Sequence, residues 1–134
     1  MRVIVCDDDR QLCSLLADYL HIRGHLCEWL VDPLQLVPWL GLNPADALIL
    51  DIDMPGMSGL ELLPRVRAAF PDLPVLMFTG AGFEESKMSA ALSHGANAYV
   101  SKGLSVGDIY VALSRVVGRA RQRAAAAAAA TAAT

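Results

Sequence analysis

The sequence has no strong charge of one sign and no long apolar run. Its 134 residues carry 11 Lys and Arg against 14 Asp and Glu, a formal net charge of −3. This balance lacks the basic footprint of a nucleic-acid-binding domain and the polybasic patch that binds acidic membranes. No apolar stretch approaches the roughly 20 residues that span a bilayer. We therefore expect a globular protein that contacts neither nucleic acid nor membrane.

Paired cysteines and metal-binding histidine pairs are also missing. The three cysteines form no Cys-x-x-Cys motif, and their odd number favours buried free thiols in a reducing compartment. His21, His25 and His94 are too scattered for a metal site, so we place them at helix ends or in loops. The apolar segment that begins at residue 3 meets acidic residues by Asp7, which is too soon for a secretory signal. We expect a cytoplasmic protein.

The sequence does contain a regular alternation of apolar runs and amphipathic stretches. With 54% hydrophobic residues, the chain is long enough for one domain whose core needs no disulfide or metal. Apolar runs predict strands at 3–6, 26–31, 47–50, 75–78 and 98–101. Helical periodicity predicts helices at about 10–23, 33–41, 58–70, 84–93 and 105–119. Strands that alternate with helices imply a doubly wound α/β domain with a parallel sheet and helices on both faces.

Several residues mark where helices begin, bend or end. Ser58 and Glu61 match a capping box, and Pro64 falls inside the same predicted helix, where it should cause a bend. After Ala120 the chain is basic and then almost pure alanine. Alanine favours an extended helix, but the segment has no varied apolar stripe to pack. We therefore expect a frayed tail over 121–134, or the start of a linker to an output domain.

Polar residues follow four of the five predicted strands. They are Asp7, Asp8 and Asp9 after the first strand, Asp51 and Asp53 after the third, Thr79 and Gly80 after the fourth, and Lys102 after the fifth. In a doubly wound fold, ligands bind at the carboxyl ends of the strands. Carboxylates held close together repel one another unless a cation is present, and Mg²⁺ accepts carboxylate, water and phosphate oxygens. The sequence therefore predicts a magnesium site.

The same residues suit phosphoryl transfer. A carboxylate can act as the nucleophile and form an aspartyl-phosphate. The metal and Lys102 would neutralise the phosphoryl oxygens, and Thr79 would donate a hydrogen bond to one of them. Gly80 brings a backbone N–H close with no side chain in the way.

Four segments, taken together, resemble the response-regulator receiver family of two-component signalling. They are Cys6-Asp7-Asp8-Asp9, Leu50-Asp51-Ile52-Asp53-Met54-Pro55-Gly56-Met57-Ser58-Gly59, Phe78-Thr79-Gly80 and Ala98-Tyr99-Val100-Ser101-Lys102. Each segment alone is weak, but four at successive strand ends are specific. The resemblance implies a receiver domain over 1–120 with a flavodoxin-like (βα)5 fold and strand order 2-1-3-4-5.

The resemblance also implies roles for the site residues. Asp51 would accept a phosphoryl group from a histidine kinase or a histidine phosphotransfer protein. Asp7, Asp8, Asp51 and the Asp53 backbone carbonyl would hold Mg²⁺, and Lys102 would pair with Asp51 and later with the phosphoryl group. Thr79 and Tyr99 would form a switch pair. The face made by 84–93, 98–101 and 105–119 would then change and control a partner, an output domain or a homodimer. Such a protein catalyses its own phosphorylation and dephosphorylation and is not an independent enzyme.

Three departures from the family pattern stand out. Gly103 follows Lys102 where many members have a cis-proline, so we expect all-trans peptide bonds there. The stretch from Thr79 to Gly95 is one residue longer than usual, which places an insertion in the loop 80–83. Asp53 adds a carboxylate at the mouth of the pocket, and we expect it to influence the lifetime of the phosphoryl group.

Simpler interpretations stand beside these. Asp7 to Asp9 could also be solvated acids at the start of a helix, and Thr79 could be an ordinary residue at a strand end. Tyr99 could be a half-buried aromatic of a strand, and Lys102 a surface lysine. For the whole chain, the main alternative is a degenerate receiver that serves as a constitutive interaction or dimerisation module. A flavin-binding protein is disfavoured because the predicted edge is acidic, whereas FMN would need neutral N–H donors. A free-standing phosphate-ester hydrolase would need a cap domain or a second general acid, and the sequence offers neither.

Overall fold

The structure is a computed structural model that describes residues 1–80 and 84–132. The strands are β1 (Arg2–Cys6), β2 (Leu26–Leu30), β3 (Ala47–Asp51), β4 (Val75–Thr79) and β5 (Ala98–Ser101). The helices are α1 (Arg10–Ile22), a 3₁₀ turn η1 (Pro33–Gln35), α2 (Leu36–Leu42), α3 (Gly59–Ala69), α4 (Glu85–Ser93) and α5 (Val106–Ala132). Every strand and helix expected from the sequence is present.

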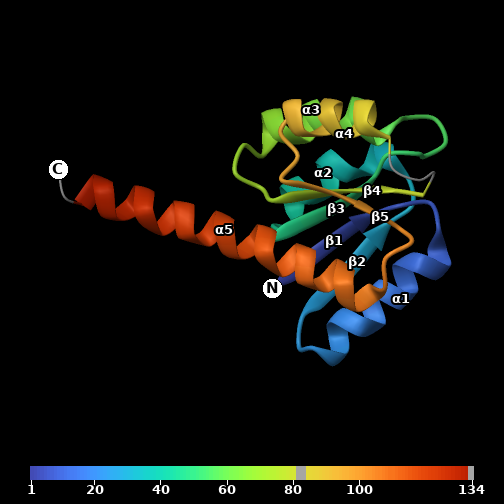
Figure 1. Ribbon diagram of the computed structural model, residues 1–134, viewed down its shortest axis with the longest axis horizontal. Helices are drawn as coiled ribbons and strands as arrows, with labels where there is room; N and C mark the ends of the chain where they lie inside the picture. Colours follow the sequence, from blue (N-terminus) through green and yellow to red (C-terminus); the bar gives the residue numbers. More distant parts are fainter. Residues whose placement is uncertain (81–83, 133–134) are drawn as a thin grey trace.

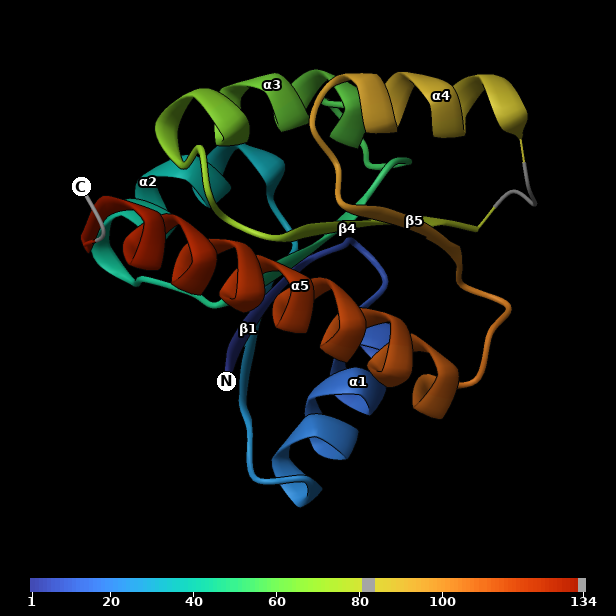
Figure 2. The same cartoon turned by 60° about the vertical axis from the view of Figure 1, so that its left-hand side comes forward.

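The five strands form one parallel sheet in the order β2-β1-β3-β4-β5. This confirms the predicted doubly wound fold and strand order. Helices α1 and α5 cover one face of the sheet, and α2, α3 and α4 cover the other (Figures 1 and 2). Because all the strands are parallel, the carboxyl ends of β1, β3, β4 and β5 lie at one edge of the sheet. The strand order reverses between β1 and β3, where ligands bind in folds of this type.

Two apolar layers hold this sheet between the helices. Every residue of β3 and β4 is buried, because strands inside a parallel sheet are covered on both faces. Ile4, Leu48 and Met77 point into the layer under α2, α3 and α4. Ile49 and Phe78 point into the layer under α1 and α5. The strand ends that carry polar residues are therefore fixed by a packed platform on both sides.

Helix capping follows the sequence with one difference in detail. The Ser58 hydroxyl accepts a hydrogen bond from the Leu60 amide at 3.2 Å, whereas the Glu61 amide bonds to the Ser58 carbonyl at 3.0 Å. The predicted capping box is therefore replaced by a cap that Ser58 makes with Leu60. Helix α3 continues from Gly59 to Ala69 with Pro64 inside it, and the expected bend at Pro64 stays a prediction.

Helix α5 continues to Ala132, where we had expected a frayed end. Residues 121–132 are exposed, so alanine's helix propensity carries this part with little packing on the domain. Figure 1 shows α5 projecting past the sheet. Even so, none of the helices in the described part of the chain has both the length and the apolar character needed to cross a bilayer.

Gly59 fixes how closely α3 approaches the end of β3. A Cβ atom at this position would collide with the Asp51 carbonyl oxygen and lie 2.8 Å from the Asp51 carbonyl carbon. The Gly59 amide donates to the Ile52 carbonyl at 2.8 Å, which ties the first turn of the helix to the strand end. Only glycine permits this approach, because the atoms that a side chain would meet belong to the backbone.

We predict that Gly59→Ala destabilises the domain by about 2 kcal/mol, within the range typical of overpacked sites. The reason is that the loop between β3 and α3 must move to admit the methyl group. Urea unfolding measures the change. Gly118→Ala is the matched control, since a Cβ at Gly118 in α5 meets no atom within 4 Å. The control should be neutral or slightly stabilising, and a Gly59→Ala protein of wild-type stability would contradict the steric argument.

Candidate functional site

The buried polar side chains of the described residues gather at one place. Asp7, Asp51 and Thr79 are 0%, 1% and 1% exposed, and each lies at or just beyond the end of a neighbouring strand. All other buried side chains in the described ranges are apolar, cysteine included. Burying polar groups is costly unless they are paired, so a concentration of them marks a site rather than ordinary core.

Lys102 joins the two buried carboxylates. Its Nζ atom lies 2.8 Å from Asp7 Oδ2 and 3.2 Å from Asp51 Oδ2. The Lys102 amide donates to the Thr79 carbonyl at 2.8 Å, which holds the chain after β5 beside the end of β4. The carboxylate oxygens that do not face Lys102 accept hydrogen bonds from backbone amides. Asp7 Oδ1 accepts from the Asp9 amide at 2.9 Å, and Asp51 Oδ1 accepts from the Asp53 amide at 3.1 Å. One ammonium group thus serves two carboxylates.

This shortage of positive charge changes the ionisation of the site. Burial, together with the negative charge of Asp7, raises the pKa of Asp51 from 3.8 to about 7, although Lys102 and the Asp53 amide oppose the shift. For Lys102, burial lowers the pKa, but the ion pairs with Asp7 and Asp51 outweigh it and raise the pKa above its ordinary value. The negative charge at this site therefore favours the binding of a further cation.

The carboxylates are arranged so that a cation fits. Asp7, Asp8 and Asp51 each offer one oxygen, and these three atoms lie within 4.8 Å of one another. Asp8 is exposed while the other two are buried, so a bound ion would face solvent on one side. Oxygen donors that leave room for water are the ligands that Mg²⁺ prefers. The donor set thus fits a hard divalent cation.

Asp53 takes a different position from the other acids. Its side chain is 54% exposed and lies 3.9 Å from Lys87 Nζ on α4. Its carboxylate is therefore not part of the cluster formed by Asp7, Asp8 and Asp51. The expected role of Asp53 as a metal ligand concerns its backbone carbonyl and stays a prediction. The contact with Lys87, which the sequence did not reveal, connects the loop after β3 with α4.

Thr79 and Tyr99 lie on adjacent strands and differ in environment. Thr79 is buried at the end of β4, opposite Ser101 in the β4–β5 register, while Tyr99 pairs with Met77 two residues earlier. The half-buried Tyr99 ring packs against the apolar layer on the α2, α3 and α4 side. Whether the two residues act as a switch pair stays a prediction.

The loops around the site test two of the expected departures. The described peptide bonds include no cis bond, which confirms the all-trans expectation at Gly103. The Gly103 amide donates to Ser101 Oγ at 3.0 Å. At Gly80 a Cβ atom would lie 3.4 Å from Lys102 Cδ, so a small residue suits this position. The expected insertion at 80–83 falls mostly on residues 81–83, outside the described part of the chain.

Comparison with known proteins decides the family. The family model for the response regulator receiver domain matches residues 3–114. The chain belongs to the response-regulator receiver family. This receiver domain is 31% identical over 121 residues to "Response regulator MprA" of Mycobacterium avium (strain 104), covering 90% of this chain and 53% of that protein. The chain thus spans about half of the length of these relatives.

Solved structures support the same assignment. A putative response regulator from Chloroflexus aurantiacus J-10-fl matches with a TM-score of 0.80 and 27% identity, over 87% of this chain and 97% of that one. NtrX from Brucella abortus matches with a TM-score of 0.87 and 24% identity, over 94% of this chain and 29% of NtrX. The second likeness shows the fold alone. The matched fold therefore makes up nearly the whole of the first chain and less than a third of the second.

We predict that Asp51→Asn stabilises the metal-free receiver domain at pH 8. A carboxyl whose pKa rises on folding weakens the folded state as the pH increases from its unfolded value, 3.8, to its folded value, about 7. Above pH 7 the whole penalty applies, and asparagine removes it. Thermal unfolding in EDTA should show a melting temperature higher by at least roughly 3 °C, the effect of about 1 kcal/mol in a domain of this size.

The difference should shrink as the pH is lowered toward 4, where Asp51 is protonated in the folded state. Asp18→Asn, which alters an exposed acid on α1, is the matched control and should change little at either pH. Equal melting temperatures for Asp51→Asn and wild type at pH 8 would mean that Asp51 carries no ionisation penalty.

Proposed function

We propose that the protein is a phosphorylation-dependent switch that accepts a phosphoryl group on Asp51. The observation that carries this proposal is the buried pair of Asp7 and Asp51 sharing the single ammonium of Lys102. A site built only for stability would pair each buried carboxylate with its own cation or replace it with an apolar residue. The surplus negative charge fits a pocket that functions with a metal ion and an incoming phosphoryl group.

The positions of these residues support the following course for phosphoryl transfer. A carboxylate oxygen of Asp51 attacks phosphorus, and the bond between phosphorus and the donor's histidine nitrogen breaks. Lys102 already lies at Asp51 and needs only a small movement to contact a phosphoryl oxygen. Thr79 ends the strand beside the one that carries Asp51, and its hydroxyl donates a hydrogen bond to another phosphoryl oxygen. Gly80 has no side chain, so its backbone N–H can come close to the phosphoryl group. The chain catalyses this step on itself and turns over no free substrate.

Asp7, Asp8 and Asp51 would hold Mg²⁺, with the Asp53 carbonyl completing the protein's share of the ligands. When bound, the ion neutralises negative charge on the carboxylates and on the phosphoryl oxygens. The side chain of Asp8 faces solvent, so the ion can enter and leave without unfolding of the pocket.

The phosphoryl donor is a histidine kinase or a histidine phosphotransfer protein, as in the two-component systems to which receivers belong. The signal passes to α4, β5 and α5 when Thr79 turns toward the phosphoryl group and Tyr99 moves inward. That face then binds a partner protein, an output domain or a second copy. The whole pathway is placed in the cytoplasm.

We predict that Mg²⁺ with beryllofluoride, a mimic of the phosphoryl group, shifts the NMR signals of the residues around Asp51. Asp51→Asn should abolish the beryllofluoride response, since beryllofluoride attaches through a bond between beryllium and a carboxylate oxygen of Asp51. Asp18→Asn again serves as the control, because it removes an exposed carboxylate of α1 and should respond as wild type does. A wild-type protein that stays unchanged at high Mg²⁺ and beryllofluoride would favour the constitutive interaction module.

We also predict that Thr79→Ala separates phosphoryl binding from the conformational response. The variant keeps Asp51, Lys102 and the metal ligands, so it should still bind Mg²⁺ and beryllofluoride. The shift of the Tyr99 amide should fall to a small fraction of the wild-type shift, since the hydroxyl that moves is gone. Thr79→Ser keeps the hydroxyl and should restore the response. A full Tyr99 shift in Thr79→Ala would show that Thr79 is only a strand-end residue.

A further inference from the structure

Lys102 lies in a short loop rather than in a strand or a helix. Strand β5 ends at the residue before it, and α5 begins at Val106. Its Nζ atom nevertheless reaches two buried carboxylates, at 2.8 Å from Asp7 Oδ2 and 3.2 Å from Asp51 Oδ2. A lysine side chain has several rotatable bonds, and holding it in one conformation costs entropy. The ammonium can therefore stay between the carboxylates only if the backbone that carries it is also fixed.

A turn that begins at Ser101 fixes this backbone. The Ser101 carbonyl accepts a hydrogen bond from the Leu104 amide at 3.2 Å, which closes a β-turn with Lys102 and Gly103 at its centre. Inside the turn, the Ser101 hydroxyl oxygen accepts from the Gly103 amide at 3.0 Å. On the other side, the Lys102 amide donates to the Thr79 carbonyl at 2.8 Å. Both oxygens of Ser101 thus hold the turn that carries Lys102.

Gly103 and the Ser101 hydroxyl suit each other. Gly103 does not have a positive φ angle, so the backbone conformation does not require glycine here. A Cβ atom at this position would lie 3.3 Å from Ser101 Oγ, which is closer than ordinary van der Waals contact. Proline, which many family members have at this position, has no N–H to donate. The hydrogen bond to the hydroxyl therefore depends on the combination of residues that this chain has.

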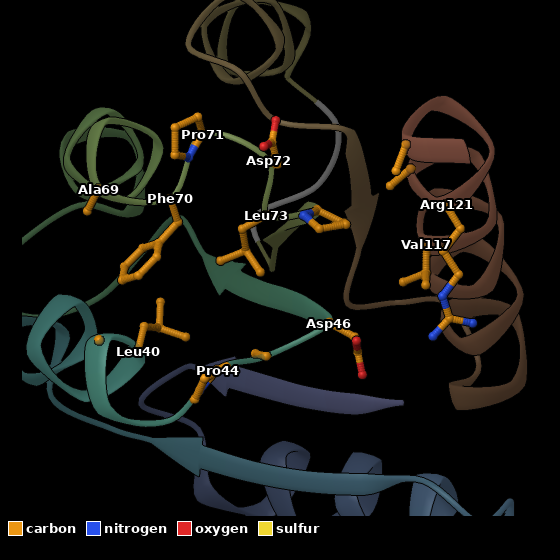
Figure 3. A pocket seen from close by; sticks show the side chains of 15 residues that line it. Leu40, Pro44, Asp46, Ala69, Phe70, Pro71, Asp72, Leu73, Val117 and Arg121 are labelled. Carbon is orange, nitrogen blue, oxygen red and sulfur yellow. The ribbon is translucent and has the colours of Figure 1, made fainter. Parts of the chain in front are cut away.

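The same loop leads into a helix that is attached to the domain mainly by its first half. The last buried residue of α5 is Val117. Farther along, the helix borders an apolar groove of about 590 Å³, with Leu40 and Phe70 on the opposite wall (Figure 3). Residues 121–132 are exposed. A tilt of α5 would therefore act on the loop that contains Lys102.

Ser105 fixes the first turn of α5 at the other end of this loop. Its hydroxyl oxygen accepts from the Asp108 amide at 3.1 Å, and its carbonyl accepts from the Ile109 amide at 3.0 Å. This is the arrangement of a helix N-cap. The two serines thus have separate roles, since Ser101 holds the turn around Lys102 and Ser105 holds the start of the helix.

We propose that Ser101 is a positioning residue for phosphoryl transfer, an inference that rests on the proposed function of Asp51. The Ser101 hydroxyl does not contact the reacting atoms. It holds the turn in the conformation that keeps the Lys102 ammonium beside Asp51, where this ammonium stabilises the charge on the phosphoryl oxygens. The acids that would bind Mg²⁺ follow β1 and β3 and do not depend on this turn. Loss of the hydroxyl should therefore affect the transfer step and spare metal binding.

Phosphorylation by phosphoramidate over a range of Mg²⁺ concentrations, followed by mass spectrometry, tests the proposal without a kinase. A carboxylate oxygen of Asp51 attacks phosphorus, the phosphorus–nitrogen bond breaks and ammonia leaves. Ser101→Ala should lower the maximal rate by roughly fivefold, the factor that corresponds to one ordinary hydrogen bond. The Mg²⁺ concentration that gives half of the maximal rate should stay at its wild-type value. Ser101→Thr keeps a hydroxyl and should retain the wild-type rate.

Ser105→Ala is the matched control, because it removes the same hydroxyl from the other end of the loop. It loses a helix cap and should lower the melting temperature, yet it should be phosphorylated at the wild-type rate. Circular dichroism should show native helix content in every variant.

Two outcomes would overturn the role of Ser101. One is a Ser101→Ala protein that reacts as fast as wild type. The other is an equal slowing in Ser101→Ala and Ser105→Ala, since the effect would then come from general loosening of the loop. A wild-type protein that phosphoramidate does not modify, or an Asp51→Asn protein that reacts equally well, would instead contradict the proposed function and remove the basis of this inference.

Discussion

The contact on which the site depends is the shared ion pair of Lys102 with Asp7 and Asp51. Three strands bring these groups together, and a packed sheet prevents them from moving apart. Two buried carboxylates share one ammonium group, so one negative charge has no cation of its own. The pKa of Asp51 is raised because burial and the charge of Asp7 disfavour its ionised form. A pocket of this kind gains stability when positive charge arrives. The fold therefore favours the binding of a cation beside the residue that would receive the phosphoryl group.

The parallel sheet explains why the buried charged residues are confined to one edge. Interior strands of such a sheet must be apolar along their length, since both faces are covered. Polar residues can then stand only at the ends, where the chain leaves the core. Gly59 adds to this arrangement, because the absence of a side chain lets α3 approach the Asp51 carbonyl closely. The Gly59 amide also donates to the Ile52 carbonyl, which limits how far the loop after β3 can relax. The geometry of the acidic site and the packing of the backbone around it thus depend on the same few residues.

Much of the fold and the site could be predicted from the sequence. Apolar runs and capping residues located every element. Asp7, Asp51, Thr79 and Lys102 lie at the ends of four of the five strands, which placed them at one edge of the sheet. Contacts between segments far apart in the chain were not predictable. Arg67, for example, donates to the carbonyls of Phe70, Leu73 and Gly95 and to Asn97 Oδ1, fastening the end of α3 to the β4 and β5 entries. No local pattern distinguishes that arginine from a surface one.

The tail shows a different limit of sequence reasoning. A run of alanines shows no apolar pattern that indicates what a helix packs against. A frayed end and a continued helix were therefore both compatible with the same residues. The structure adds the missing element, which is the direction of α5 relative to the body: its inner side faces an apolar groove, while its outer side faces water.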